Sequence, residues 1–148
     1  MKIFTVNQIH AADAYTIEQQ AITSDDLMER AAMAFTLVFT QLFKPPKRIF
    51  IFCGTGNNGG DGLCIARLLH HKGYEVKVYI LRLSNNCSPD FLINEQRLKP
   101  YPISVNTINT PQDVPSQLAN NKPAIVIDAL FGSGLNRPLK GLAAQMVL

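Results

Sequence analysis

The spacing of hydrophobic residues changes near residue 48. Before that point they recur at helical intervals in two segments, one from Thr5 to about Gln20 and one from Ser24 to the Pro45-Pro46 pair. The run Thr5-Val6-Asn7-Gln8 has the form of a capping box, which favours a helix start there. In the second helix we expect one apolar stripe to face the core. Its members are Leu27, Ala31, Phe35, Val38 and Leu42.

From Arg48 onward, short apolar runs alternate with helix-period segments. This alternation is typical of right-handed βαβ units in a parallel sheet. We therefore predict an α/β fold, a Rossmann-like three-layer αβα arrangement with a parallel sheet, preceded by two N-terminal helices. The expected strands are Arg48–Cys53, Glu75–Leu81, Ile103–Thr107 and Ala124–Asp128, and the expected helices are Asp61–Lys72, Pro89–Leu98, Pro111–Asn120 and one starting at Gly141.

Composition narrows the class of protein. The 148 residues are 47% hydrophobic and 17% charged with a net charge of +3, which fits one globular domain over residues 1–148. There is no Lys/Arg run to indicate nucleic acid, and no apolar stretch near the roughly 20 residues of a membrane span. The N-terminus lacks the apolar core of a signal peptide, so we expect a cytoplasmic protein. Three cysteines without a C-x-x-C pair argue against a disulfide framework or a zinc site.

A glycine-rich loop follows the first expected strand. Five glycines fall within Gly54–Gly62, between an apolar run and a helix-period segment. Because a strand, a glycine loop and a helix N-terminus together form an anion cradle, we expect a nucleotide or phosphate ligand here. We interpret the number of glycines as a sign that the backbone approaches that ligand closely. A P-loop is excluded, because the chain has no Gly-Lys-Ser/Thr.

The same loop satisfies the G-x-G-x-x-G fingerprint of dinucleotide-binding oxidoreductases over Gly54–Gly59. That fingerprint needs an acidic residue at the end of the second strand to hold the ribose hydroxyls. The strand here ends at Leu81, followed by Arg82 and Leu83, with no acid. Arg82 could instead meet a 2′-phosphate. A nicotinamide-dependent oxidoreductase therefore remains as a weaker alternative.

A second group of polar residues surrounds Asp128. This aspartate ends an apolar strand, at the edge where open α/β sheets bind ligands, and Gly132-Ser133-Gly134 follows it. A turn or capping carboxylate is the simpler interpretation of Asp128. The second glycine loop favours a ligand-binding role instead. Oxygen ligands from Asn58 and Asp128 would suit a hard cation better than zinc.

Three motifs carry a family resemblance. They are Gly56-Asn57-Asn58-Gly59-Gly60-Asp61-Gly62, then Asp128 to Leu135 with Arg137-Pro138, and the upstream Ser24 to Ala31. In this order they resemble the YjeF N-terminal domain family, the NAD(P)H-hydrate epimerases, and together they cover nearly the whole chain. The resemblance implies an isomerase that interconverts the R and S forms of hydrated NADH and NADPH, a repair step for damaged cofactor.

The resemblance also implies the site residues. By this resemblance, a potassium ion would be held by Asn58 and Asp128. Of the aspartates in this chain, Asp61 is the better candidate for the acid/base, because Asp128 would be occupied by the cation. The alternative acid/base is a further aspartate that the family carries downstream of these motifs. The implied substrate-binding residues are Asn57, Asn58, Gly59, Gly60 and Asp61 in the first motif, and Gly132, Ser133, Gly134, Leu135, Asn136, Arg137 and Pro138 in the second.

The family continues into a further strand with a Val-Asp-Ile-Pro-Ser-Gly type motif, and this sequence ends before one. We therefore interpret residues 1–148 as a single domain that is incomplete at its C-terminus. Some family members add an ADP-dependent dehydratase, which is an expected fused or separate partner. The amphipathic leading helices offer a surface for a homodimer. A non-catalytic nucleotide-binding or protein-interaction scaffold of the same fold is the main alternative function.

Overall fold

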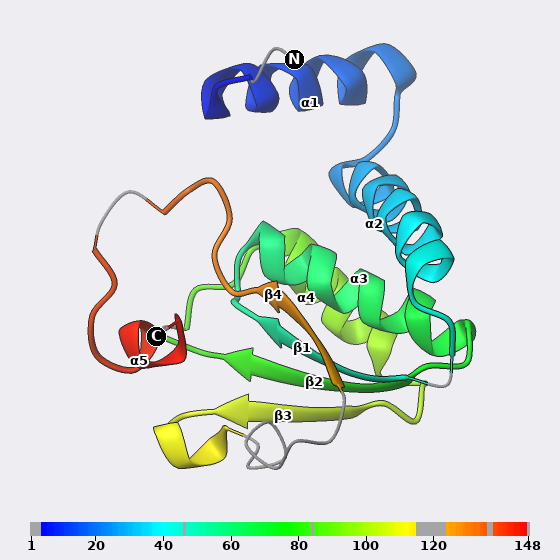
Figure 1. Ribbon diagram of the computed structural model, residues 1–148. Coiled ribbons are helices and arrows are strands. Elements are labelled where there is room, and N and C mark those ends of the chain that lie inside the picture. The colour runs from blue at the N-terminus through cyan, green and yellow to red at the C-terminus, as the bar shows by residue number, and fades with distance from the viewer. Residues whose placement is uncertain (1–3, 46, 84, 115–123, 136–137, 148) are drawn as a thin grey trace.

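A computed structural model describes residues 4–45, 47–83, 85–114, 124–135 and 138–147 (Figure 1). Two helices precede a unit in which strands and helices alternate, and α1 lies apart from the sheet (Figure 1). The helices are α1 (Val6–Gln20), α2 (Ser24–Leu42), α3 (Asn57–His71), α4 (Pro89–Leu98), the 3₁₀ turn η1 (Pro111–Asp113) and α5 (Gly141–Val147), and the strands are β1 (Arg48–Cys53), β2 (Glu75–Leu81), β3 (Ser104–Ile108) and β4 (Ala124–Ala129).

The four described strands form one parallel sheet in the order β3-β2-β1-β4. Cys53, at the end of β1, pairs with Ile80 of β2 on one side and Ala129 of β4 on the other. The carboxyl ends of these three strands therefore meet at one edge of the sheet. The α/β prediction is confirmed. Helices α2, α3 and α4 cover one face of the sheet, where Leu69 of α3 lies in one core cluster with Ile51 and Val78 of the strands. Helix α5 covers the other face, against the cluster that contains Phe50.

The strand and helix boundaries test the sequence pattern closely. Those of β1, β2 and α4 agree with expectation. Strand β3 lies one residue later than expected and β4 is one residue longer, which is the usual uncertainty at element ends. Where the helix Pro111–Asn120 was expected, the structure has the 3₁₀ turn η1, which ends at Asp113 with an extended Val114, and residues 115–123 lie outside the described residues. Helix α3 starts at Asn57 and not at Asp61, which matters for the site.

The stripe expected to bury α2 is wrong. Phe35, Val38 and Leu42 are exposed, and the residues that face the core are Met28, Ala32, Thr36 and Phe39. Ala32 and Thr36 are small, which allows α2 to lie close to α3 and turns the larger side chains outward. The outward side chains border a groove of about 450 Å³ between α2 and β4.

Polar contacts fix α2 against α3. The Glu29 carboxylate accepts a hydrogen bond from Arg67 over 2.5 Å and another from the Cys64 thiol over 3.0 Å. Burial raises the pKa of Cys64 to about 12, so this thiol stays protonated and packs as a small core residue. Glu29 is thus a helix-pairing residue. None of the helices in the described residues combines the length and the apolar character of a membrane span.

Candidate functional site

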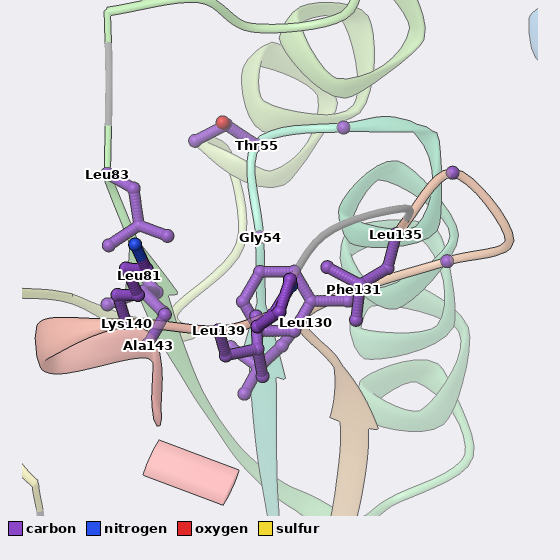
Figure 2. Close-up of a pocket in the computed structure, with 14 residues that line it drawn as sticks. Gly54, Thr55, Leu81, Leu83, Leu130, Phe131, Leu135, Leu139, Lys140 and Ala143 are labelled. Atoms are coloured by element: carbon purple, nitrogen blue, oxygen red, sulfur yellow. The ribbon is translucent and has the colours of Figure 1, made fainter. Parts of the chain in front are cut away.

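A cavity of about 740 Å³ lies at the carboxyl edge of the sheet, where β1, β2 and β4 end (Figure 2). Open α/β sheets place ligands at this edge. Figure 2 shows side chains reaching it from three directions: the first glycine loop, the end of β2, and the chain between β4 and α5. The lining residues are Gly54, Thr55, Gly56, Leu81, Leu83, Leu130, Phe131, Gly132, Gly134, Leu135, Pro138, Leu139, Lys140 and Ala143.

The Asn57–Asp61 segment is the first turn of α3 and not a loop. Gly56 is the N-cap and supplies no side-chain hydrogen bond, and the first turn carries no acidic residue. The first N–H groups of a helix have no partner within the helix and lie at the positive end of its dipole. The start of α3 therefore presents free donors at the edge of the cavity, next to Gly56.

Most of the glycines are required by the packing of the protein on itself. A Cβ on Gly54 would lie 2.1 Å from the Leu130 carbonyl oxygen, and one on Gly59 would lie 1.9 Å from the Gly54 oxygen. Our interpretation that five glycines mark close approach to a ligand is thus wrong for four of them, because the close neighbour is the chain itself. Gly56 is the exception, with open space around it. The other two glycines with close protein neighbours are Gly60 and Gly62.

Two side chains fix the start of the second glycine loop. The Asn58 side-chain amide donates to the Phe131 carbonyl over 3.1 Å, and an Asp128 carboxylate oxygen accepts from the Leu130 N–H over 2.9 Å. The two residues expected to bind a cation thus hold consecutive residues of the same turn. Among the described residues, the Asn58 amide oxygen and the second Asp128 oxygen accept no hydrogen bond, so both remain available as oxygen ligands.

The two motifs differ in how they meet the cavity. In the second motif, Gly132, Gly134, Leu135 and Pro138 line it, whereas Ser133 is exposed outside the lining and Asn136 and Arg137 lie outside the described residues. None of the residues Asn57–Asp61 lines the cavity. The first motif therefore borders the cavity through the preceding glycines and through the contact with Phe131. The described residues contain no cluster of three or more His, Cys, Asp or Glu side chains suited to a metal.

Asp61 lies in a separate acidic environment. Burial, together with the smaller effect of the negative charges of Asp90 on α4 and Asp13 on α1, raises the pKa of its carboxyl group to about 6. Asp90 is itself buried and accepts a hydrogen bond from the Ser24 hydroxyl over 2.6 Å. A carboxyl group with a pKa near 6 can exchange a proton near neutral pH, as an acid/base requires.

Sequence reasoning missed two features of the cavity. Leu81, Leu83 and Leu139 contribute apolar walls, and Lys140 contributes a cationic side chain. The hint that Arg82 could meet a 2′-phosphate is wrong, because its guanidinium pairs with Glu95 and lies over the Phe91 ring, outside the lining. No signal in the sequence identified Lys140, since the route of the chain from residue 130 to 140 is not encoded in any periodicity.

Comparison with known proteins gives a consistent set of relatives. A family model described as YjeF-related protein N-terminus matches residues 24–147. The chain is 35% identical to an NAD(P)H-hydrate epimerase of Roseobacter litoralis, over 95% of this chain and 67% of that protein. It is 31% identical to a bifunctional NAD(P)H-hydrate repair enzyme, Nnr, of Thermofilum pendens, over 99% of this chain and 28% of that protein.

A solved structure shares the fold. The crystal structure of yeast ynu0, YNL200c, superposes with a TM-score of 0.81 and 25% identity, covering 99% of this chain and 63% of the yeast chain. The sequence thus spans about two thirds, or less, of each of these proteins. The matched region contains both glycine motifs and the cavity between them.

Proposed function

Because the chain belongs to the YjeF-related protein N-terminus family, we propose that it acts in NAD(P)H-hydrate epimerisation, the interconversion of the R and S forms of hydrated NADH and NADPH. The observation that carries the proposal is the cavity of about 740 Å³ at the junction of the two motifs. Its volume and apolar walls suit a cofactor-sized ligand. The names of the relatives, which refer to NAD(P)H hydrate, support the same substrate class.

The substrate would contact the N-terminus of α3 and the second motif beside it. The free N–H groups at the start of α3, beside Gly56, suit the diphosphate of the cofactor. The second motif, from Gly132 to Pro138, supplies further backbone groups along the cavity. For Asp61 to take part, the hydrated nicotinamide ring must lie over the first turn of α3 while the rest of the cofactor occupies the cavity.

Epimerisation needs a proton donor and a proton acceptor at one carbon. In one route the hydroxyl group takes a proton and leaves as water, and water returns on the other face and gives up a proton. In the other route the ring opens and recloses. Asp61 can serve either route, because a carboxyl group with a pKa of about 6 is populated in both protonation states near neutral pH.

A potassium ion at Asn58 and Asp128 is part of the same proposal. Both residues hold the Leu130-Phe131 turn and keep one side-chain oxygen free, and hard cations prefer oxygen ligands. When bound, the ion would supply positive charge beside the turn that borders the cavity. The contribution of the protein is to fix Asn58 and Asp128 through the hydrogen bonds described above.

The proposal includes a cytoplasmic compartment and two kinds of partner. Three free cysteines fit a reducing cytoplasm. The bifunctional relative supports a dehydratase as a fused or separate partner that consumes the epimer produced here. A homodimer would bury the outward face of α2, where Phe35, Val38 and Leu42 are exposed, and α1, which buries none of its residues.

The test is an epimer assay on the 148-residue protein. A single epimer of NADH hydrate or NADPH hydrate is incubated with it, and formation of the other epimer is followed by chromatography above the spontaneous rate. Enzymatic interconversion is expected. A folded protein that gives none contradicts the proposal for this chain. Incubation with intact NADPH and a carbonyl substrate is the parallel control, in which oxidation of NADPH would favour an oxidoreductase.

The role of Asp61 is tested in the same assay. Asp61→Asn keeps the size of the side chain and removes the exchangeable proton. We expect interconversion to fall by roughly 10²-fold or more, the usual contribution of a general acid/base. Unchanged turnover would remove Asp61 from the mechanism and leave the proposed activity standing.

A further inference from the structure

Lys140 is the cationic side chain that the described residues contribute to the cavity wall. It lies one residue before α5, on the segment that returns from the second glycine loop. In Figure 2 its side chain extends toward Leu81 and Leu83, and all three line the cavity. The ammonium group therefore lies on the side of the cavity bordered by the carboxyl end of β2.

Nothing in the described part of the chain neutralises this lysine. The ion pairs there join Arg48, Arg67, Arg82 and Arg97 to carboxylates and leave Lys140 out. Of the residues that the structure describes, no aspartate or glutamate lines the cavity. A lysine that faces a cavity without a counter-ion favours a ligand with an anionic group at that place. Because the ammonium group is exposed, it stays partly hydrated, and pairing it with an anion costs little desolvation.

The end of β2 is informative about the kind of anion. In open α/β sheets that bind dinucleotides, the end of the second strand lies beside the adenosine ribose. An acidic residue there accepts hydrogen bonds from a free 2′-hydroxyl, whereas a cation accommodates a 2′-phosphate. Strand β2 ends at Leu81 without an acid, and the guanidinium of Arg82 is engaged by Glu95. Among the described residues, Lys140 is left as the free cation on this side.

We propose that Lys140 binds the 2′-phosphate of the cofactor, so that the site favours NADPH hydrate over NADH hydrate. The proposal rests on the proposed function for the identity of the ligand. It assigns a specificity-determining residue outside both motifs. The alternative source of phosphate in the same ligand is the diphosphate bridge, which NADH hydrate and NADPH hydrate share.

Binding of adenosine 2′,5′-bisphosphate and of 5′-AMP, measured by calorimetry, tests this without requiring catalysis. The wild-type protein is expected to bind the 2′-phosphorylated nucleotide more tightly. Lys140→Met should weaken that binding by about tenfold and leave 5′-AMP unchanged, since a charge-assisted hydrogen bond is worth roughly one factor of ten. Lys140→Arg should retain the preference. Lys47→Met is the matched control, because Lys47 is exposed just before β1, at the opposite edge of the sheet.

The outcomes separate the two proposals. Equal binding of both nucleotides by the wild type, or a preference that survives Lys140→Met, overturns the role of Lys140 whether or not the protein epimerises hydrates. In the same calorimetry with NAD⁺ and NADP⁺, an equal loss of affinity for both on Lys140→Met assigns Lys140 to the diphosphate that they share and also overturns its 2′-phosphate role. If the preference depends on Lys140 and no interconversion occurs, the proposed function fails and the phosphate site stands. If interconversion occurs with equal kcat/KM for the two hydrates, the function stands and the 2′-phosphate role fails.

Discussion

The side-chain amide of Asn58 donates a hydrogen bond to the carbonyl oxygen of Phe131 across 3.1 Å, joining the first turn of α3 to the loop after β4. These residues are far apart in the sequence and belong to the two different motifs. The contact makes the motifs one structural unit at the edge of the cavity. It also explains why an asparagine is used there, since its amide can donate while its oxygen remains free.

Loss of this bond should loosen the site. Asn58→Ala removes the donor and leaves the Phe131 carbonyl without it, which should lower the free energy of unfolding by about 1 kcal/mol. Urea unfolding measures the difference. Asn57→Ala is the matched control, because Asn57 is the exposed neighbouring asparagine. Equal stabilities for the two variants would show that the Asn58 contact contributes nothing to folding.

Two glycines of the first motif should differ strongly in how much stability they lose on substitution by alanine. Gly59→Ala would place a methyl group 1.9 Å from the Gly54 carbonyl oxygen, a backbone atom that cannot rotate away. We expect a loss of roughly 3 kcal/mol or more, or failure to fold. Gly56→Ala meets no atom within 4 Å, and because alanine is a poorer N-cap than glycine it should cost about 1 kcal/mol or less in stability. Thermal unfolding separates them, and a well-folded Gly59→Ala protein would contradict the packing described here.

Asp61 should make stability depend on pH in a defined direction. Its folded pKa of about 6 lies above the ordinary value of 3.8, so the folded state binds the proton more tightly than the unfolded state. The resulting stability is fully present below the unfolded pKa and is lost as pH rises from about 4 through 6. Asp61→Asn should abolish this contribution and raise stability at pH 8 by about 1 kcal/mol, after allowance for solvent screening. Urea unfolding at pH 5 and pH 8 measures it, and parallel pH profiles for both proteins would refute it.

Asp90 should tune the same carboxyl group. Its negative charge helps to raise the pKa of Asp61, and Asp90→Asn removes that charge while keeping the size of the side chain. The acidic limb of the pH–rate profile for interconversion should then move to lower pH. Asp113→Asn, at the exposed 3₁₀ turn, is the control for a general change in charge. An unshifted limb in Asp90→Asn would disconnect Asp90 from the proton transfer.

Removal of potassium should reduce activity. Replacing K⁺ by tetramethylammonium, which amide and carboxylate oxygens cannot coordinate closely, should lower both the melting temperature and the rate of interconversion. Asp128→Asn should make the protein insensitive to this exchange, because one charged ligand is lost. Equal behaviour in the two salts would remove the cation from the proposal.

Much of the frame could be predicted, because its local pattern and its packing agree. The bounds of β1 and β2 follow from short, mostly apolar runs that begin with a charged residue, as in strands of a buried parallel sheet. The start of α3 could not be predicted in this way. Asn57-Asn58-Gly59-Gly60 has poor helix propensity, and the turn forms because Gly59 packs on Gly54. That contact is tertiary and has no sequence periodicity.

The buried face of a helix and the partner of a charged side chain were harder to predict than the positions of helices and strands. On α2, apolar residues occupy two neighbouring stripes, and the small Ala32 and Thr36 decided which stripe packs on α3. The partners of charged side chains could not be predicted either, because they lie on other elements. Arg82 lies at the expected end of β2, yet Glu95 on α4 engages it, and the free cation comes from Lys140 instead. Sequence spacing locates a side chain along an element and leaves its neighbours across space undetermined.

The backbone contacts of Gly54 have a thermodynamic consequence. Its N–H donates to the Ala129 carbonyl over 3.0 Å, and its α-carbon lies too near Leu130 to carry a side chain. Contacts within the protein therefore hold the strand ends and the start of α3 in fixed relative positions without a ligand. A ligand arriving at this edge finds a preorganised surface and has little loop entropy to remove. Affinity should then depend on the groups it meets, and exchange of ligand should leave the backbone of the glycine junction unmoved.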